Sequence, residues 1–212
     1  MVQNRSHAVM SQRHEAHDSL DFFPTPPWAT RALCGEVLFP HWGLNLHDLT
    51  AWEPACGMGS MASPLGEYFG SVRASDIHPY GFGEVHDFLM PYHPNPLPDW
   101  IITNPPFRLG EQFARRALHL ALDGVALLVR TAFLESADRY KLFKDDPPAL
   151  VAQFSERVPM VKGRLDRQAS TATSYCWIVW RKGYYDTRMR WIRPCRKHLD
   201  RDTDWPESEA AA

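Results

Sequence analysis

A short run near the middle of the chain carries groups that could hold an amine. The sequence DWIITNPPF places Asn104, Pro105, Pro106 and Phe107 directly after an apolar segment. Two prolines cannot continue a hydrogen-bonded strand, so the chain must leave the sheet stiffly. This stiffness predicts that the Asn104 side chain and the Pro105 carbonyl stand as neighbouring acceptors, with the ring of Phe107 beside them for stacking.

Two fixed acceptors suit an exocyclic amino group, which has two hydrogens to donate. Hydrogen bonding to both draws the nitrogen toward tetrahedral geometry, so its lone pair is less delocalised and can attack an electrophilic methyl group. Asn104 is neutral, so we expect it to orient and polarise the amine without acting as a full base. A turn that merely ends a strand is the structural alternative for this run.

A glycine loop, EPACGMG, follows an earlier apolar segment and contains Glu53, Cys56, Gly57 and Gly59. Two glycines after a strand let the backbone turn tightly and approach a ligand at the start of a helix. The loop lacks the lysine of a phosphate-binding loop. The pattern therefore favours a nucleoside that carries no phosphate, and a purely structural glycine turn is the alternative.

Three further residues suit the same ligand. Asp76 lies roughly 20 residues after the loop, where a carboxylate at the end of the next strand can accept both ribose hydroxyls. Asp87 and Phe88 could take an amino group and cover the ring of an adenine. Taken singly, Asp76 could equally cap a helix, and Asp87-Phe88 is a common surface dipeptide.

The elements that must position these residues alternate between strand and helix. Helices are predicted over residues 27–39, 61–68 and 111–122. Strands are predicted over 49–54, over 71–76, which ends in an acid, and over 100–103, 125–130, 150–155 and 174–180. Because the last two strands have no obvious helix between them, the pattern predicts an α/β sheet with parallel strands first and an antiparallel strand near the end. Trp177 and Trp180 are expected in the core.

Composition limits the class of protein. The chain has 212 residues, of which 44% are hydrophobic, so it can bury a core, and wholesale disorder is excluded. No apolar run approaches the roughly 20 residues that cross a bilayer, and the polar start has no signal-peptide pattern. Four scattered cysteines without a CxxC pair indicate a reducing, cytoplasmic setting. His7, His14 and His17 lack accompanying carboxylates, so no metal site is predicted.

Charge is unevenly distributed. The net charge of −2 does not indicate a uniformly basic nucleic-acid binder. The stretch 181–201, however, interleaves arginines and lysines with aromatic residues, as phosphate-tracking and base-stacking surfaces do. Candidate DNA contacts there and in the loop before 174 are Arg164, Arg167, Arg181, Lys182, Arg188 and Arg190, with an ordinary solvated surface as the alternative. We expect an N-terminal arm (1–20), a catalytic domain (21–185) and a basic, then acidic, C-terminal extension (186–212) that frays from residue 201.

The motifs in their order resemble a known family. EPACGMG, the acid of ASDI, HDF and IITNPPF resemble the motifs of S-adenosylmethionine-dependent amino-methyltransferases. DFFPTPPW at 21–28 resembles the upstream segment of DNA adenine methyltransferases. Segments 130–143, 154–163 and 174–183 are similar to phage- or prophage-encoded DNA N6-adenine methyltransferases. The resemblance covers residues 21–183, and the cofactor loop precedes NPPF, as in the γ arrangement.

The resemblance implies a Rossmann-like class I methyltransferase fold: a mostly parallel seven-stranded sheet with an antiparallel strand and helices on both faces. It implies methyl transfer from S-adenosylmethionine to adenine N6 in DNA, after base flipping or on single-stranded DNA. No large target-recognition domain follows, which points to relaxed specificity or recognition through a homodimer. The alternatives are the same chemistry on an RNA adenine or a protein glutamine, or a non-catalytic nucleic-acid-binding protein that keeps the fold.

The resemblance also implies roles for individual residues. The target base would be held by Asn104, Pro105, Pro106 and Phe107. The cofactor would be contacted, from its methionine end to its adenine, by Phe23, Thr25, Pro26, Glu53, Cys56, Gly57, Gly59, Asp76, Ile77, Asp87 and Phe88.

Overall fold

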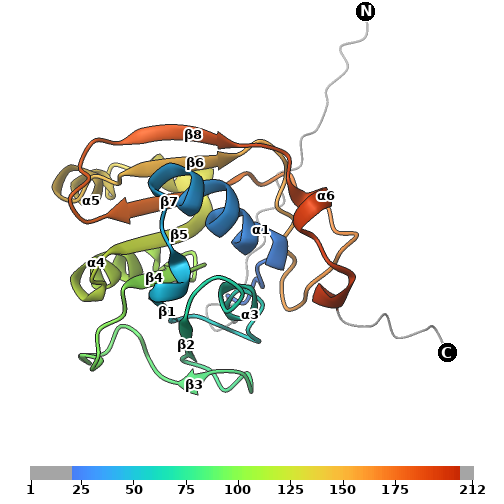
Figure 1. Cartoon of the computed structure of the whole chain (residues 1–212), viewed down its shortest axis with the longest axis horizontal. Helices are drawn as coiled ribbons and strands as arrows, with labels where there is room; N and C mark the ends of the chain where they lie inside the picture. Colours follow the sequence, from blue (N-terminus) through green and yellow to red (C-terminus); the bar gives the residue numbers. More distant parts are fainter. Residues whose placement is uncertain (1–20, 206–212) are drawn as a thin grey trace, which may run out of the picture.

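A computed structural model describes residues 21–205, which form one mixed sheet covered by helices (Figure 1). The sheet has eight strands in the order β3-β2-β1-β4-β5-β7-β6-β8. Their bounds are β1 Thr50–Glu53, β2 Ser71–Asp76, β3 Glu84–Val85, β4 Trp100–Thr103, β5 Gly124–Arg130, β6 Leu150–Phe154, β7 Tyr175–Arg181 and β8 Arg188–Ile192. The α/β class is confirmed, but the expected number of seven strands is wrong.

The two edge strands, β3 and β8, are not predicted by the sequence pattern. β3 has only two residues, and β8 reads Arg-Met-Arg-Trp-Ile, of which Ile192 alone is buried. An edge strand with one buried side chain has neither an apolar run nor a clear alternation to reveal it. The basic stretch after residue 186 therefore contributes a strand, which pairs with β6 in parallel.

Strand direction explains where a site can form. β1, β2, β3, β4 and β5 are parallel, β7 is antiparallel to β5 and β6, and β8 runs parallel to β6. The predicted antiparallel strand is thus β7, whose arrow points against its neighbours in Figure 1. The carboxyl ends of all the other strands meet at one edge of the sheet, which we call the carboxyl edge. In open α/β sheets, ligands bind at that edge.

Helices cover both faces of the sheet, as expected. One face packs against the first helical run and α3, and the other against α4 and α5. The helices are α1 Pro27–Ala32, α2 Phe39–Trp42, α3 Ala62–Leu65, α4 Gly110–Leu120, α5 Tyr140–Asp145 and α6 Arg196–Leu199. A π-helical segment, η1 Leu33–Leu38, joins α1 to α2, and short 3-10 turns are η2 Leu46–Asp48, η3 Thr131–Leu134 and η4 Asp202–Asp204. Within residues 21–205 no helix is long and apolar enough to cross a membrane.

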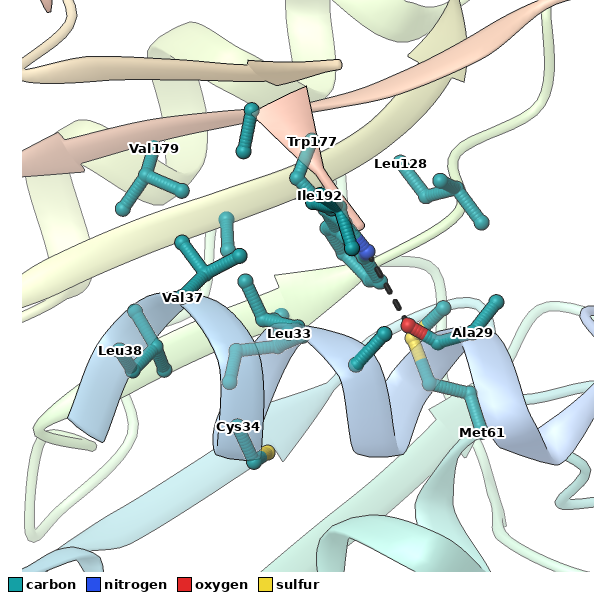
Figure 2. Close-up of a cluster of buried hydrophobic side chains, with 14 of the residues drawn as sticks. Ala29, Leu33, Cys34, Val37, Leu38, Met61, Leu128, Trp177, Val179 and Ile192 are labelled. Carbon is teal, nitrogen blue, oxygen red and sulfur yellow. Dashed lines mark hydrogen bonds between the residues drawn. The ribbon is translucent and has the colours of Figure 1, made fainter. Parts of the chain in front are cut away.

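The first helical run is fastened to the sheet through Trp177. Its indole Nε1 donates a hydrogen bond to the Ala29 carbonyl at 3.2 Å, between β7 and α1 (Figure 2). Leu33, Val37 and Leu38 belong to the same buried cluster as Trp177, so the helical run packs against this face of the sheet. Trp177 and Trp180 are both buried, which confirms their predicted place in the core.

The described end of the chain is also fixed. Arg31, buried in α1, donates to Glu67, to both carboxylate oxygens of Asp204 and to the Leu199 carbonyl. Arg201 also pairs with Glu67. The prediction of a tail that frays from residue 201 is therefore wrong for 201–205, because a buried arginine needs these carboxylates as partners. Residues 206–212 and the predicted arm, 1–20, lie outside the described residues.

Candidate active site

A cavity of about 370 Å³ opens at the carboxyl edge, where β1, β2 and β4 end. Segments far apart in the sequence meet there: 21–25 before α1, the loop after β1, the residues after β2, 87–89, 104–107 and the first turns of α4. Parallel strands bring these loops together because each strand ends on the same side. The volume lies within the range of about 300–1,000 Å³ typical of small-molecule sites.

Most of the sequence-predicted site residues line this cavity. They are Phe23, Thr25, Glu53, Cys56, Asp76, Ile77, Asp87, Phe88, Asn104, Pro105, Pro106 and Phe107. Pro26, Gly57 and Gly59 are not among the lining residues. Further residues line the cavity without having been predicted individually: Asp21, Phe22, Pro24, Pro54, Ala55, Ser60, His78, Tyr80, Leu89, Leu109 and Phe113. The first five lie inside the motifs DFFPTPPW and EPACGMG, and Phe113 lies on the apolar face predicted for its helix, so these six had a signal in the sequence.

Asn104 is held in one orientation. Its Nδ2 donates to the Phe23 carbonyl at 3.0 Å and to Thr25 Oγ1 at 3.1 Å, and lies 3.5 Å from the sulfur of Met160. Its Oδ1 is buried, and none of the described residues donates a hydrogen bond to it. An unpaired buried acceptor costs free energy, so its retention points to a ligand that donates there.

The segment before α1 is tied to the residues after β4 at a second point. The Phe107 amide donates to Asp21 Oδ2 at 2.6 Å, and the rings of Phe23 and Phe107 lie 5.0 Å apart. Phe22 stacks on Tyr80 with ring centroids 4.6 Å apart. The Phe22 carbonyl accepts a hydrogen bond from the Gly163 amide. Residues 21–25 therefore form one wall of the cavity.

The glycine loop shapes the cavity through its backbone. Gly57 has φ +51°, and a Cβ there would come within 2.4 Å of the Phe22 ring. Gly59 has φ +85°, and a Cβ there would come within 2.4 Å of the Phe82 ring. The two glycines are thus required by their backbone conformation and by the close approach of aromatic rings, although neither lines the cavity.

Pro26, the third predicted site residue that does not line the cavity, precedes α1. Its carbonyl accepts a hydrogen bond from the Ala29 amide, so it starts the helix.

Glu53, at the end of β1, is a buried acid in the cavity wall. Burial, and then the nearby charge of Asp76, raise the pKa of this carboxyl, and the Ala62 backbone amide opposes the rise. Its Oε2 finds no hydrogen-bond donor within the described part of the chain. Burial also raises the pKa of Cys56 to about 12, so this thiol is neutral and unsuited to act as a nucleophile.

The other two acids are partly engaged by backbone. Asp76 accepts from the Gly57 amide at 2.9 Å and from the His78 amide at 3.0 Å, which links β2 to the glycine loop. Asp87 Oδ1 accepts from the Leu89 amide at 2.9 Å. A carboxylate has about four acceptor positions, so both acids retain capacity for hydroxyl or amino donors. The Phe88 ring is buried against Trp52 and Phe113, with ring centroids 5.2 and 5.0 Å away, and is one of the residues that line the cavity.

One face of the Phe107 ring is covered by the side chain of Arg130. The guanidinium carbon of Arg130, at the end of β5, lies 3.7 Å from the centroid of the Phe107 ring. This geometry is a close cation–π contact. Arg130 could not be predicted at the site from the sequence, because it comes close to Phe107 only through the pairing of β4 with β5.

The six candidate DNA-contact residues do not line the cavity, and they lie in three places. Arg164 and Arg167 lie in the loop between β6 and β7, paired with Asp166 and with Asp200 and Asp202. Arg181, Lys182 and Arg188 lie where β7 ends and β8 begins, at the opposite edge of the sheet from Asn104. Arg190 is in the middle of β8.

No family model matches this chain, and no curated protein matches it by sequence. Solved structures do match its fold. A candidate class I S-adenosylmethionine-dependent methyltransferase from Listeria monocytogenes aligns with TM-score 0.57 and 13% identity, over 85% of this chain and 68% of its own. The methyltransferase subunit of a type I restriction-modification system from Streptococcus thermophilus aligns with TM-score 0.61 and 13% identity, over 86% and 49%.

The modification subunit of a candidate type I restriction enzyme from Vibrio vulnificus aligns with TM-score 0.56 and 14% identity, over 91% of this chain and 51% of its own. This chain therefore spans about half the length of the two restriction-modification subunits. The fold is that of the Rossmann-like class I methyltransferases.

Proposed function

We propose that this chain transfers a methyl group from S-adenosylmethionine to the N6 amino group of adenine in DNA. The observation that carries the proposal is the state of Asn104: its Nδ2 is anchored to Phe23 and Thr25, and its buried Oδ1 is left without a donor. An amide fixed in this way offers an acceptor and no donor to whatever enters the cavity. A primary amine supplies the missing hydrogen.

The cavity fits the proposed cofactor in its charges and shape. The unpaired Glu53 Oε2 suits a cationic group, and burial makes such a pairing strong. Asp76 and Asp87 retain acceptor positions for ribose hydroxyls and an adenine amino group. Ile77 and Phe88 offer apolar surface to the adenine ring, and the wall of Phe22 and Tyr80 completes the enclosure. When bound, S-adenosylmethionine supplies an electrophilic methyl group on a sulfonium centre.

The remaining chemistry is positioning by this chain's own residues. Asn104 Oδ1 and the Pro105 carbonyl accept the two amine hydrogens, and Pro105 and Pro106 hold both acceptors stiffly after β4. This directs the nitrogen lone pair away from the acceptors and reduces its delocalisation. The neutral amide does not take up the proton released after transfer, which passes to solvent. Fixed geometry of this kind is worth several orders of magnitude in rate.

The choice of DNA rests on the resemblance of the motifs and agrees with the restriction-modification neighbours. An adenine inside a duplex cannot reach a cavity between loops, so the target base must flip out or come from single-stranded DNA. The ring of Phe107, backed by Arg130, gives the extruded base a surface to stack on. We place the reaction in the cytoplasm, where the buried thiols stay reduced.

The test is methylation with cofactor labelled in its methyl group. Double-stranded DNA, single-stranded DNA, RNA and a protein extract are offered separately, and labelled DNA is digested to nucleosides. We expect label in N6-methyladenine and none with Asn104→Ala. Label confined to RNA or to protein would overturn the choice of substrate. Absence of S-adenosylmethionine binding in calorimetry would overturn the methyltransferase itself and favour a non-catalytic binding protein.

A further inference from the structure

The edge of the sheet opposite Asn104 carries two hollows that no step of the proposed reaction uses. Their volumes are about 260 and 380 Å³, and they share Tyr184 and Tyr185. The larger is lined by His41, Trp42, Ala149, Gly183, Tyr184, Tyr185, Asp186 and Arg188. They lie at this edge because Gly124 starts β5 where Arg181 ends β7. We call this region the amino-edge surface: His41, Trp42, Arg181, Tyr184, Tyr185, Arg188 and Arg190.

The base of this surface is a fixed stack of rings around Arg181. Its guanidinium carbon lies 5.4 Å from the Trp42 ring centroid and 5.0 Å from that of Tyr184. The Trp42 and Tyr184 rings meet edge to face at 5.9 Å, and Arg181 Nε is 3.6 Å from Asp123. The cation is thereby held in place, so Arg181 is a fixed part of the surface and not a mobile contact.

The outer part of the surface is exposed and basic. Tyr185 is 72% exposed, and the Arg188 side chain is 65% exposed. Arg188 and Arg190 alternate along β8, so they point to the same face of the sheet as buried Ile192. Asp186 lies 4.0 Å from Arg188 but is 92% exposed, where water screens its charge.

The electrostatic effect of the arginines is felt at His41. Burial, and then Arg190, Arg188 and Arg181, lower the pKa of this imidazole. His41 is therefore neutral near pH 7, and its Nδ1 has no hydrogen-bond partner among the described residues. The hollow thus combines positive potential, exposed aromatic rings and an unpaired ring nitrogen.

We propose that the amino-edge surface binds a strand of nucleic acid, with an unpaired base stacked on Tyr185 and phosphates paired with Arg188 and Arg190. Stacking on aromatic rings and cations along the backbone are the two interactions that single-strand-binding surfaces combine. Arg188 and Arg190 are two residues apart on the open edge strand β8, so they suit successive phosphates of a nucleic-acid backbone. A free nucleotide, by contrast, carries its charge at one end only. The site is separate from the Asn104 cavity, so it holds whether or not the methyl-transfer proposal holds.

The test uses fluorescence anisotropy with a labelled oligothymidine of about 12 nucleotides, a length within the site sizes of single-strand-binding folds. Thymine has no exocyclic amine, so the probe does not suit the Asn104 acceptors. We expect Tyr185→Ser to weaken binding about tenfold. We expect Arg188→Gln with Arg190→Gln to weaken binding and to reduce the slope of log affinity against log salt by about two. The matched controls are Tyr140→Ser and Lys141→Gln, which change an exposed tyrosine and an exposed cation on α5.

The remaining arms separate the sources of the ligand. Binding of thymidine monophosphate as tight as that of the strand would overturn the strand proposal in favour of a free nucleotide. A duplex bound as tightly as the single strand, with Tyr185→Ser without effect, would overturn base stacking. If the α5 control variants lose as much affinity for oligothymidine, binding is due to non-specific attraction to charge and not to the amino-edge surface. Asn104→Ala is expected to keep full oligothymidine binding while it loses methylation, so failure of one proposal is distinguishable from failure of the other.

Discussion

The Nδ2 atom of Asn104 lies 3.1 Å from Thr25 Oγ1, across 79 residues of sequence. The bond joins the loop after β4 to the segment that precedes α1. It fixes the orientation of the Asn104 amide and ties residues 21–25, which line the cavity, to the loop after β4. Positioning of the acceptor and closure of the cavity are thus two results of one contact.

Replacing Asn104 tests the acceptor. We expect Asn104→Ala to lower the rate of methyl transfer at least about tenfold to a hundredfold, the scale of one well-placed hydrogen bond in a transition state. Affinity for S-adenosylmethionine should change little, because in the proposed function Oδ1 binds the target amine and not the cofactor. Single-turnover rates and calorimetry measure the two quantities. An equal loss of cofactor affinity would show that Asn104 serves the cofactor instead.

Replacing Thr25 tests the anchor of that acceptor. Thr25→Val keeps the buried volume and removes the hydroxyl, so Asn104 retains only the Phe23 carbonyl as a close oxygen partner. We expect methyl transfer to fall about tenfold, with Thr25→Ser restoring it because serine keeps the hydroxyl. Measuring kcat/KM for the nucleic acid in the wild type and in both variants tests this prediction. If Thr25→Ser is as impaired as Thr25→Val, packing of the methyl group and not the hydrogen bond accounts for the effect.

The glycine loop offers a matched pair of substitutions. Gly57→Ala places a Cβ 2.4 Å from the Phe22 ring, whereas Gly81→Ala has a similarly positive φ of +85° and nothing within 4 Å. Both variants should lose about 1 kcal/mol of stability from backbone strain. Only Gly57→Ala should also weaken S-adenosylmethionine binding, because Phe22 must move from the cavity wall. Calorimetry and thermal unfolding separate the two effects, and equal cofactor affinity in both variants would contradict this role of Phe22.

Glu53 predicts a pH dependence of cofactor binding. Burial raises the pKa of this carboxyl above that of the unfolded chain. The folded apoprotein therefore holds a proton that the unfolded chain loses, so this group's contribution to stability falls as pH rises from about 4.3 through the raised pKa. A cationic ligand favours the ionised form, so cofactor affinity should rise with pH over the same window, with proton release.

Glu53→Gln provides the comparison, because glutamine cannot ionise. We expect weaker cofactor binding and a flat pH profile for this variant. Calorimetry in buffers of different ionisation enthalpy measures the released proton. If the pH profile of cofactor affinity is as flat for the wild type as for Glu53→Gln, Glu53 does not contact the cationic group of the cofactor.

Arg31 predicts a stability contribution from the end of the described chain. Burial would raise the pKa of Asp204, but hydrogen bonds from Arg31 and its charge outweigh this and lower it. Arg31→Ala removes the buried cation that joins Glu67 to Asp204 and leaves Glu67 paired with Arg201 alone. We expect the free energy of unfolding to fall by about 3 kcal/mol. Lys141→Ala, in an exposed pair with Asp145 on α5, should change stability little. Urea unfolding of both variants decides whether the contact matters.

Two strands that carry the site could be predicted from sequence because of how they end, although only β4 is buried throughout and β2 is mostly half-exposed. Both have the predicted bounds: Ser71–Asp76 ends in an acid, and Trp100–Thr103 ends before Asn104 and two prolines. β8 could not be predicted, because its side chains are mostly exposed and its strand conformation comes from pairing with β6. The fixed position of residues 201–205 could not be predicted either, because it depends on the contact of Asp204 with Arg31, 173 residues earlier.

Sequence by itself determined the chemical types at the site: a rigid acceptor after a strand, a glycine loop and a series of acids, because these depend on local backbone constraints such as proline and glycine. Tertiary structure alone decided which end of the Asn104 amide is free and that Arg130 covers Phe107. It also decided that Arg181, Lys182 and Arg188 lie at the opposite edge of the sheet from the cavity. Those properties arise from strand order and direction, which bring distant residues together and separate near ones. Local sequence preferences carry no information about such placement.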